Sequence, residues 1–259
     1  MKKITATIIT LNEAENIRDC IASVLPVCDE IIVVDSGSED ETVAIAESMG
    51  ARVFHQSYLG DGPQKDFGVQ FARNDWILSI DADERLEDDA VRAIDGLELE
   101  NTDADAFAFR RRNYVGRHWI RAAGFYPDEV VRLYNRQKCR YLSKKKHSRV
   151  EARKIKHLSA HIQHLTYRDY AHWIERINQL SSRDAWAMYE DGRCVRPLTP
   201  FFRSIWAMFR KLILKGGIFQ GKDGFTVAIT TAFHVYFKYL KFLELQEKQH
   251  EINSQEESD

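Results

Sequence analysis

The chain has 259 residues, of which 44% are hydrophobic and 29% are charged, and this balance is typical of a globular protein rather than a disordered one. The four cysteines lie far apart without a CxxC pair, which argues against a disulfide framework or a zinc knuckle and fits a reducing compartment. The N-terminal residues MKKITATIITLNE have no long apolar h-region and no cleavage site, so the sequence predicts no signal peptide. It also predicts no membrane-spanning helix, since no run of about 18 uncharged apolar residues occurs.

The net charge of −2 hides a strong asymmetry along the chain. Residues 1–100 carry 22 acids and 8 bases, whereas residues 101–246 carry 12 acids and 28 bases. No acid interrupts the seven bases between Arg193 and Lys222. This pattern indicates an acidic half that can hold cations and a basic half that faces an anionic partner. The alternative is a pair of oppositely charged, solvated surfaces.

Apolar strands and amphipathic helices alternate over the first 100 residues. The predicted strands are 5–10, 30–35, 51–55 and 76–81, and the predicted helices are 12–25, capped by Asn12, and 42–49, 62–72 and 87–97. Such alternation predicts βαβ units and a mostly parallel sheet flanked by helices, an α/β fold. Further strands are predicted at 107–112 and 130–134, helices at 169–190, 200–214 and 225–245, and a polar, frayed tail from residue 246.

Polar clusters follow three of these strands. They are Thr10-Leu11-Asn12-Glu13, the run from Asp35 to Asp40, and Asp81-Ala82-Asp83-Glu84. In an open parallel sheet, ligands bind outside the carboxyl ends of the strands. The glycine fingerprint of dinucleotide sites and the Walker A loop are both absent, which argues against NAD binding and P-loop hydrolysis.

Asp81 and Asp83 are the most informative pair in the sequence. Two carboxylates two residues apart after an apolar strand can share one hard divalent cation, Mg²⁺ or Mn²⁺, which would also hold a diphosphate. The alternative is a solvated turn that caps the next helix.

The motifs ITLNE near Asn12, VVDSGSEDET around Asp35, and ILSIDADE at 77–84 resemble glycosyltransferase family 2. The resemblance continues through QKDFG at 64–68, GFYPDEVVRLY at 124–134 and IFQGKDGF at 218–225, and covers roughly 1–245. Within the family the chain is similar to the lipopolysaccharide core β-glucosyltransferase type. The resemblance implies a GT-A fold, a nucleotide-sugar donor and an inverting, single-displacement reaction.

The resemblance also implies roles for residues of the donor site. Residues 10–13 would border the uridine, Asp35 would hold the base or ribose, and Lys65 would lie near the uracil or diphosphate. Asp81 and Asp83 would bind the metal, with Asp83 the more direct ligand. Asp35 has an alternative role as the cap of a turn with Ser38, and Lys65 as a solvated helix lysine.

An inverting transferase needs a base that takes the proton of the acceptor hydroxyl. The resemblance places this base at Asp128 or Glu129, with Asp128 preferred; the alternative is a loop acid that caps the next strand. Arg132 would contact the acceptor or a phosphate. His147 and Glu151 resemble a histidine–glutamate feature of related enzymes, and His164 a position near the diphosphate.

The spacing of three histidines, His157, His161 and His164, allows two interpretations. Their spacing places three imidazoles on one face if the segment is helical, which would suit zinc. The alternation in HIQHLTY instead indicates a strand.

The segment 201–214 places Phe202, Ile205, Phe209 and Leu212 on one stripe flanked by bases. This composition is typical of a helix at the surface of an anionic membrane, although such a helix can also close the core of its own protein.

We therefore expect an inverting hexosyltransferase that moves glucose from UDP-glucose to a lipid-linked core oligosaccharide. The expected partners include an anionic membrane surface but no nucleic acid, and the expected location is the cytoplasmic face of the inner membrane. The expected domains are 1–165 for catalysis, 166–246 for acceptor and membrane, and a flexible acidic tail at 247–259. Alternatives are transfer to another cell-surface glycan, a sugar nucleotidyltransferase, and a catalytically silent lipid-binding module.

Overall fold

The computed structural model describes residues 3–141 and 149–256, and the chain forms two compact units. The first unit contains residues up to Asn113 together with Pro127–Thr166, and the second contains Tyr114–Tyr126 together with the chain from Tyr167 onward. Each unit has buried apolar clusters of its own.

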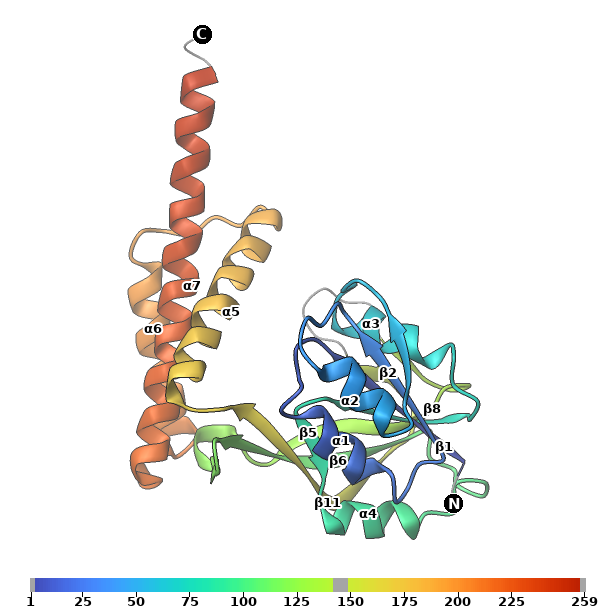
Figure 1. Cartoon of the computed structure of the whole chain (residues 1–259). Coiled ribbons are helices and arrows are strands. Elements are labelled where there is room, and N and C mark those ends of the chain that lie inside the picture. Colours follow the sequence, from blue (N-terminus) through green and yellow to red (C-terminus); the bar gives the residue numbers. More distant parts are fainter. Residues whose placement is uncertain (1–2, 142–148, 257–259) are drawn as a thin grey trace. The chain divides into compact units, whose positions relative to one another are not determined.

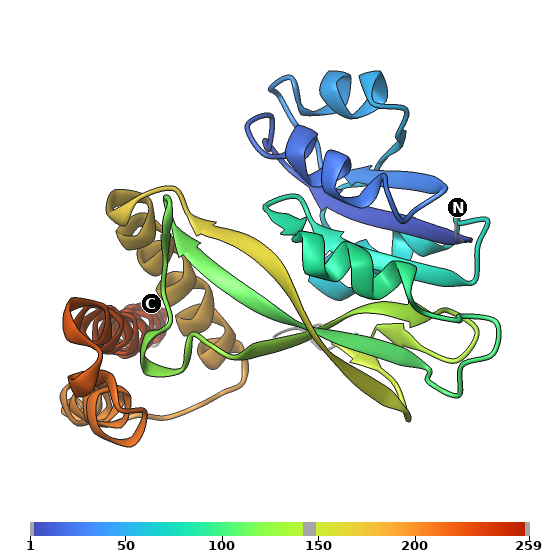
Figure 2. The ribbon, with the colours of Figure 1, turned by 90° about the horizontal axis from the view of Figure 1, so that it is seen from below.

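The first unit is built on a mixed sheet in the order β3-β2-β1-β4-β8-β6-β11-β5. Its strands are β1 (Ile4–Thr10), β2 (Glu30–Asp35), β3 (Arg52–His55), β4 (Trp76–Asp81), β5 (Glu84–Leu86), β6 (Ala106–Val115), β8 (Asp128–Asn135) and β11 (Ile155–Tyr167). The strands β1 to β4 pair in parallel, as the sequence predicts, whereas β8 is antiparallel to both β4 and β6. The long neighbouring strands β6 and β11, green and yellow, form a twisted ribbon (Figure 2). A short pair, β9 (Arg140–Tyr141) and β10 (Val150–Glu151), forms a separate sheet.

Helices cover both faces of this sheet. These helices are α1 (Ile17–Val24), α2 (Thr42–Ser48), α3 (Asp61–Val69) and α4 (Asp88–Asp95). Apolar residues of α1, α2 and α4 join one buried cluster, and Phe67 and Val69 of α3 pack against the other. This two-faced burial explains why β1, β2 and β4 are almost continuously apolar.

The prediction that Asn12 caps the first helix is wrong. The helix begins at Ile17, with Asn16 at the N-cap position, and Asn12 itself has a positive φ of 55°. Its backbone N–H donates to Ser38 Oγ at 2.8 Å, and its Oδ1 accepts from the backbone of Glu39 at 2.9 Å. Asparagine tolerates this left-handed conformation better than most residues. Asn12 therefore ties the loop after β1 to the loop after β2.

The second unit is largely helical. It contains α5 (Tyr170–Glu190), α6 (Thr199–Phe209), a π-helical turn (Arg210–Leu214), a 3₁₀ turn (Gly217–Phe219) and α7 (Gly221–Glu256), with the short strand β7 (His118–Trp119) and a 3₁₀ turn at Ala122–Gly124. The helices α5 and α6 both lie along α7 (Figure 1). The helix predicted over 200–214 thus changes hydrogen-bond pattern after Phe209, and the last helix extends past residue 246, where a frayed tail was predicted.

Candidate active site

The strand register brings the three predicted polar clusters together. Thr10 is opposite Asp35 in the β1–β2 pair, and Ile9 is opposite Asp81 in the β1–β4 pair. The carboxyl ends of β1, β2 and β4 therefore meet at one edge of the sheet. The loop after β1 is held to the loop after β2 by the two Asn12 bonds and by the Glu13 N–H, which donates to Thr42 Oγ1 at 2.8 Å. Leu11 is half exposed beside them.

Asp35 is buried at this edge and organises its own loop. Its Oδ2 accepts from the backbone of Gly37 at 2.9 Å and of Ser38 at 3.0 Å, and its Oδ1 accepts from Ser38 Oγ at 2.5 Å. This is the turn-capping arrangement that the sequence left open as an alternative. Asp35 therefore fixes the conformation of the loop that follows β2.

Asp81 lies between two buried cations. Lys65 Nζ is 2.6 Å from its Oδ1, and Arg132 Nη2 is 2.7 Å from its Oδ2. Burial would raise the pKa of Asp81, but Arg132 and Lys65 outweigh it and hold the pKa of this carboxyl far below its ordinary range. Lys65 is therefore no solvated helix lysine, since its side chain is only 6% exposed. Burial would lower the pKa of Lys65, but Asp81 outweighs it and the pKa is raised.

Glu84 is a fully buried carboxylate whose role the sequence did not predict. Its Oε1 accepts from Arg132 at 2.5 Å and from Arg111 at 3.2 Å, and its Oε2 accepts from the Asp81 N–H at 3.2 Å. Arg132, expected to contact the acceptor or a phosphate, lies between Asp81 and Glu84. A buried charge needs such partners. In the sequence, Glu84 is visible as the glutamate that ends the motif DADE, and this position is the only hint of its role that the motif offers.

A chain of close polar contacts links the predicted metal ligand to the predicted base. Asp83 Oδ2 lies 3.2 Å from His164 Nε2, and His164 Nδ1 lies 2.7 Å from Asn113 Oδ1. Asn113 Nδ2 then donates to Asp128 Oδ2 at 3.2 Å. Because Arg111 and Asn113 are two residues apart on β6, both side chains lie on one face, and Arg111 also donates to Asp128 Oδ2 at 2.9 Å. Neither residue was predicted from the sequence.

Asp128 and Glu129 point to opposite faces of β8 because successive strand residues alternate. Glu129 pairs with His157 at 2.8 Å and with Arg110 at 3.6 Å, away from this chain of bonds. All donors to Asp128 among the described residues reach Oδ2, so none of them occupies Oδ1. The free oxygen makes Asp128 the better candidate for a base.

The three histidines do not form one zinc site. They lie on the strand β11, and each contacts a different carboxylate: Glu129 for His157, Asp89 for His161 and Asp83 for His164. The helical alternative is therefore wrong. Glu151 lies on β10 opposite Arg140, and His147 lies outside the described residues.

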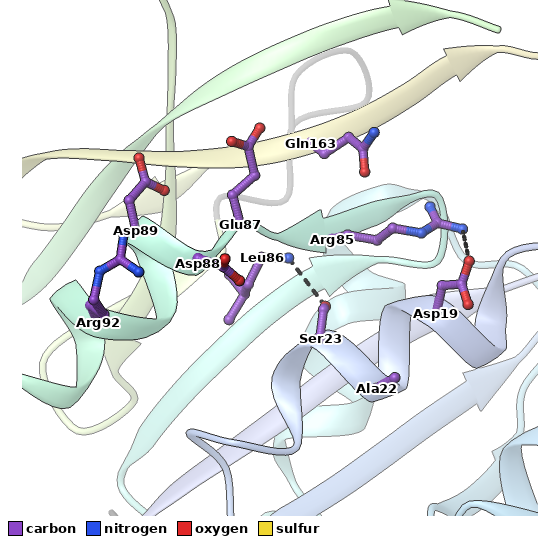
Figure 3. Close-up of a pocket in the computed structure, with 10 residues that line it drawn as sticks. All are labelled: Asp19, Ala22, Ser23, Arg85, Leu86, Glu87, Asp88, Asp89, Arg92 and Gln163. Carbon is purple, nitrogen blue, oxygen red and sulfur yellow. Dashed lines mark hydrogen bonds and ion pairs between the residues drawn. The ribbon is translucent and has the colours of Figure 1, made fainter. Parts of the chain in front are cut away.

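A separate pocket lies beside α1, β5 and α4 (Figure 3). None of the predicted site residues lines it. Arg85 turns toward Asp19 at 3.4 Å, and the Leu86 N–H donates to Ser23 Oγ at 3.1 Å. Glu87 and Asp89 line this pocket, and with His161 they offer three ligand atoms within 4.8 Å of one another, a group that could hold a metal. In the structure Arg112 binds Glu87 and His161 binds Asp89, so a cation would have to replace these contacts.

The chain matches the family Glycosyl transferase family 2 over residues 5–168 and belongs to that family. It is 32% identical to an uncharacterized glycosyltransferase of Rickettsia bellii, over 94% of this chain and 87% of the relative. It is 29% identical to the lipopolysaccharide core biosynthesis glycosyltransferase LpsC of Rhizobium meliloti, over 92% and 91% of the two chains. The solved structure of S. aureus TarS 1–349 in complex with UDP is similar with a TM-score of 0.49 and 12% identity, over 93% and 92%. The protein is thus a family 2 glycosyltransferase, and its helix-flanked mixed sheet has the GT-A fold.

Proposed function

We propose that the enzyme transfers glucose from UDP-glucose, with inversion, to an inner-core saccharide of lipopolysaccharide. The family and the 29% identity to LpsC support a core saccharide as acceptor. The observation that carries the reaction is the chain of close polar contacts from Asp83 through His164 and Asn113 to Asp128. It connects groups suited to the leaving diphosphate with a group suited to the attacking hydroxyl.

On the donor side, we assign the uridine to the loop of Thr10, Leu11, Asn12 and Glu13 and to the loop shaped by Asp35. Lys65 and Arg132 bring two positive charges to the end of β4, where Asp81 holds them. Both cations are already paired with Asp81 and Glu84, so a diphosphate at this edge would have to share them, and its oxygens can pair with ammonium and guanidinium groups. Loss of Lys65 would therefore weaken donor binding.

The residues present also fit a divalent cation, Mg²⁺ or Mn²⁺. Because Asn113 Nδ2 donates to Asp128, Asn113 Oδ1 faces His164 Nδ1 and accepts a hydrogen bond from it, while His164 Nε2 faces Asp83. A lone pair on Nε2 beside a carboxylate is a donor set that a cation satisfies. We assign Asp83 and His164 as first ligands, with Asp81 beside them. When bound, the cation would neutralise charge on the departing diphosphate.

On the acceptor side, we assign Asp128 as the general base. Arg111 and Asn113 hold its Oδ2 and leave Oδ1 free to accept the proton of an acceptor hydroxyl. A positioned base contributes about 10²–10⁴-fold to such a step.

The C-terminal unit, which includes most of 166–246, is our candidate for docking on an anionic membrane surface. No helix among the described residues has the length and apolar character to cross a membrane. Instead, α6 exposes large apolar side chains: Phe201, Phe202, Ile205, Trp206 and Phe209 are 43% to 63% exposed. Together with Arg203 and Arg210 they favour peripheral binding at the cytoplasmic face of the inner membrane.

The test is incubation of the purified protein with a panel of nucleotide sugars and truncated core lipid, followed by mass measurement of the product. A hexose added from UDP-glucose is expected. Transfer only to another glycan would contradict the proposed acceptor but would still support the proposed glycosyl transfer. Binding to lipid without any transfer would favour the catalytically silent module instead.

A further inference from the structure

A cavity of about 810 Å³ opens where the chain enters α6. It is lined by Arg196, Pro197, Leu198, Thr199, Phe202, Arg203 and Trp206. Leu198, Phe202 and Trp206 are each more than half exposed. The cavity therefore combines an apolar wall that is open to solvent with two guanidinium groups.

The arginines of this cavity are free to bind an anion. Neither Arg196 nor Arg203 forms an ion pair with a described residue, and both are exposed. Arg193, just outside the cavity, shows the contrast because it pairs with Asp191 at 3.3 Å. The turn that carries Arg196 is fixed, since its backbone N–H donates to Thr199 Oγ1 at 3.1 Å. A fixed turn lowers the entropy lost when a ligand binds.

The lining selects an amphiphilic anion over other ligands. Guanidinium groups match the geometry of phosphate oxygens and can bind them bidentately. A free phosphate would leave the apolar wall in water, and a neutral apolar ligand would leave both arginines unused. Tryptophan suits the boundary between an apolar phase and water.

We propose that this cavity is a binding site for the phosphate headgroup of one anionic phospholipid, with the start of its acyl chains against Leu198, Phe202 and Trp206. The site rests on the proposed membrane docking and adds a saturable pocket to it. Docking would then depend on two particular arginines more than on the total charge of the segment.

The first experiment titrates the full-length protein with monomeric, short-chain phosphatidic acid in a calorimeter. Arg196→Gln/Arg203→Gln is compared with Arg210→Gln/Lys222→Gln, which removes the same charge from exposed positions outside the cavity. We expect saturable one-to-one binding by the wild type and the control, and a loss of at least about tenfold in affinity for the cavity variant. Equal losses of affinity in both variants would contradict a specific site in the cavity and would favour general electrostatic attraction. If inorganic phosphate binds as tightly as the lipid, the apolar wall does not contribute and the proposal of an amphiphilic ligand is wrong.

The second experiment tests the apolar wall with two tryptophans of equal exposure. Trp206 and Trp186 are both 55% exposed, but only Trp206 lines the cavity. Trp206→Ala should weaken lipid binding severalfold, whereas Trp186→Ala should leave it unchanged; equal effects would contradict the assignment. Sugar transfer to a delipidated acceptor is measured for each variant in parallel. Absence of transfer in every protein, including the wild type, would defeat the proposed function without affecting the lipid site.

Discussion

The two units use positive charge in opposite ways. In the first unit Lys65 and Arg132 are buried, and carboxylates contact both of them. In the second unit Arg203 and Arg210 are exposed beside exposed aromatic side chains and form no ion pair with a described residue. Buried pairs fix geometry at a cost in desolvation, while exposed bases remain available to a partner. The contrast separates cations that are fixed by buried carboxylates from cations that are open to solvent.

Replacing Glu84 with glutamine should lower the free energy of unfolding, because it breaks the buried network of ion pairs. The change removes the fully buried carboxylate that Arg132 and Arg111 share, while Asp81 and Asp128 still pair with them. The cost in the free energy of unfolding should therefore lie toward the lower end of the about 3–5 kcal/mol that is typical of a broken buried pair. Urea denaturation would measure it. Asp19→Asn removes an exposed partner of Arg85 and should leave stability nearly unchanged. Equal effects of the two changes would contradict the contrast between buried and exposed ion pairs.

Asp128→Asn should lower kcat by at least about 10²-fold while UDP binding stays nearly intact, because a general base acts on the acceptor. Glu129→Gln is the matched control on the other face of β8 and should retain most of its activity. Steady-state kinetics with the truncated core acceptor would measure both. If Glu129→Gln is the crippled variant, the base is the neighbouring residue.

Charge reversal in the second unit should release the protein from anionic vesicles without unfolding it. Each exposed base near such a surface contributes about 1 kcal/mol, so Arg203→Glu, Arg210→Glu and Lys215→Glu together should reduce binding at least about 100-fold. Lys211 is left unchanged because its Nζ donates to the Ala123 carbonyl at 2.8 Å. Vesicle cosedimentation at low and high salt would measure the loss. Unchanged binding would mean that these bases do not contact lipid.

Acid should weaken the first unit through Asp81. Its pKa in the folded protein lies below the unfolded value of about 3.9, so the unfolded chain binds the proton first as the pH falls. The stabilisation is therefore fully present above about pH 5, begins to fall as the pH drops below about 4, and continues to fall toward the much lower pKa of the folded state. Denaturation at several pH values should show the difference between wild type and Asp81→Asn shrinking in acid. A constant difference would contradict the depressed pKa.

Local patterns predicted the parallel part of the fold and the edge where the site lies. The apolar runs of β1, β2 and β4 are explicit in the sequence, and parallel strands bring Asp35 and Asp81 to one edge. The antiparallel pairing of β5 with β11 could not be predicted, although it places His164 opposite Glu84 and next to Asp83. That pairing depends on contacts between segments about 80 residues apart, for which a single sequence gives no local signal.

The partners of the predicted residues were also beyond the sequence. Arg111 and Asn113 belong to an arginine-rich strand without a recognisable motif, and only the register of β6 with β8 places Arg111 opposite Asp128. The sequence also did not predict whether the apolar face of α6 is exposed, because an amphipathic helix has the same residue pattern whether it closes a core or faces a membrane. In the structure Phe202 and Trp206 are more than half exposed, so these two side chains do not close the core.

The most direct test of the proposed reaction site is calorimetric titration of UDP with and without Mn²⁺, for the wild type and for Asp83→Asn. The donor set of Asp83 and His164 predicts that Mn²⁺ tightens UDP binding to the wild type at least about tenfold and has little effect on the variant. A melting curve would confirm that the variant is folded. UDP affinity that is the same with and without Mn²⁺ in the wild type would contradict the assignment of this site.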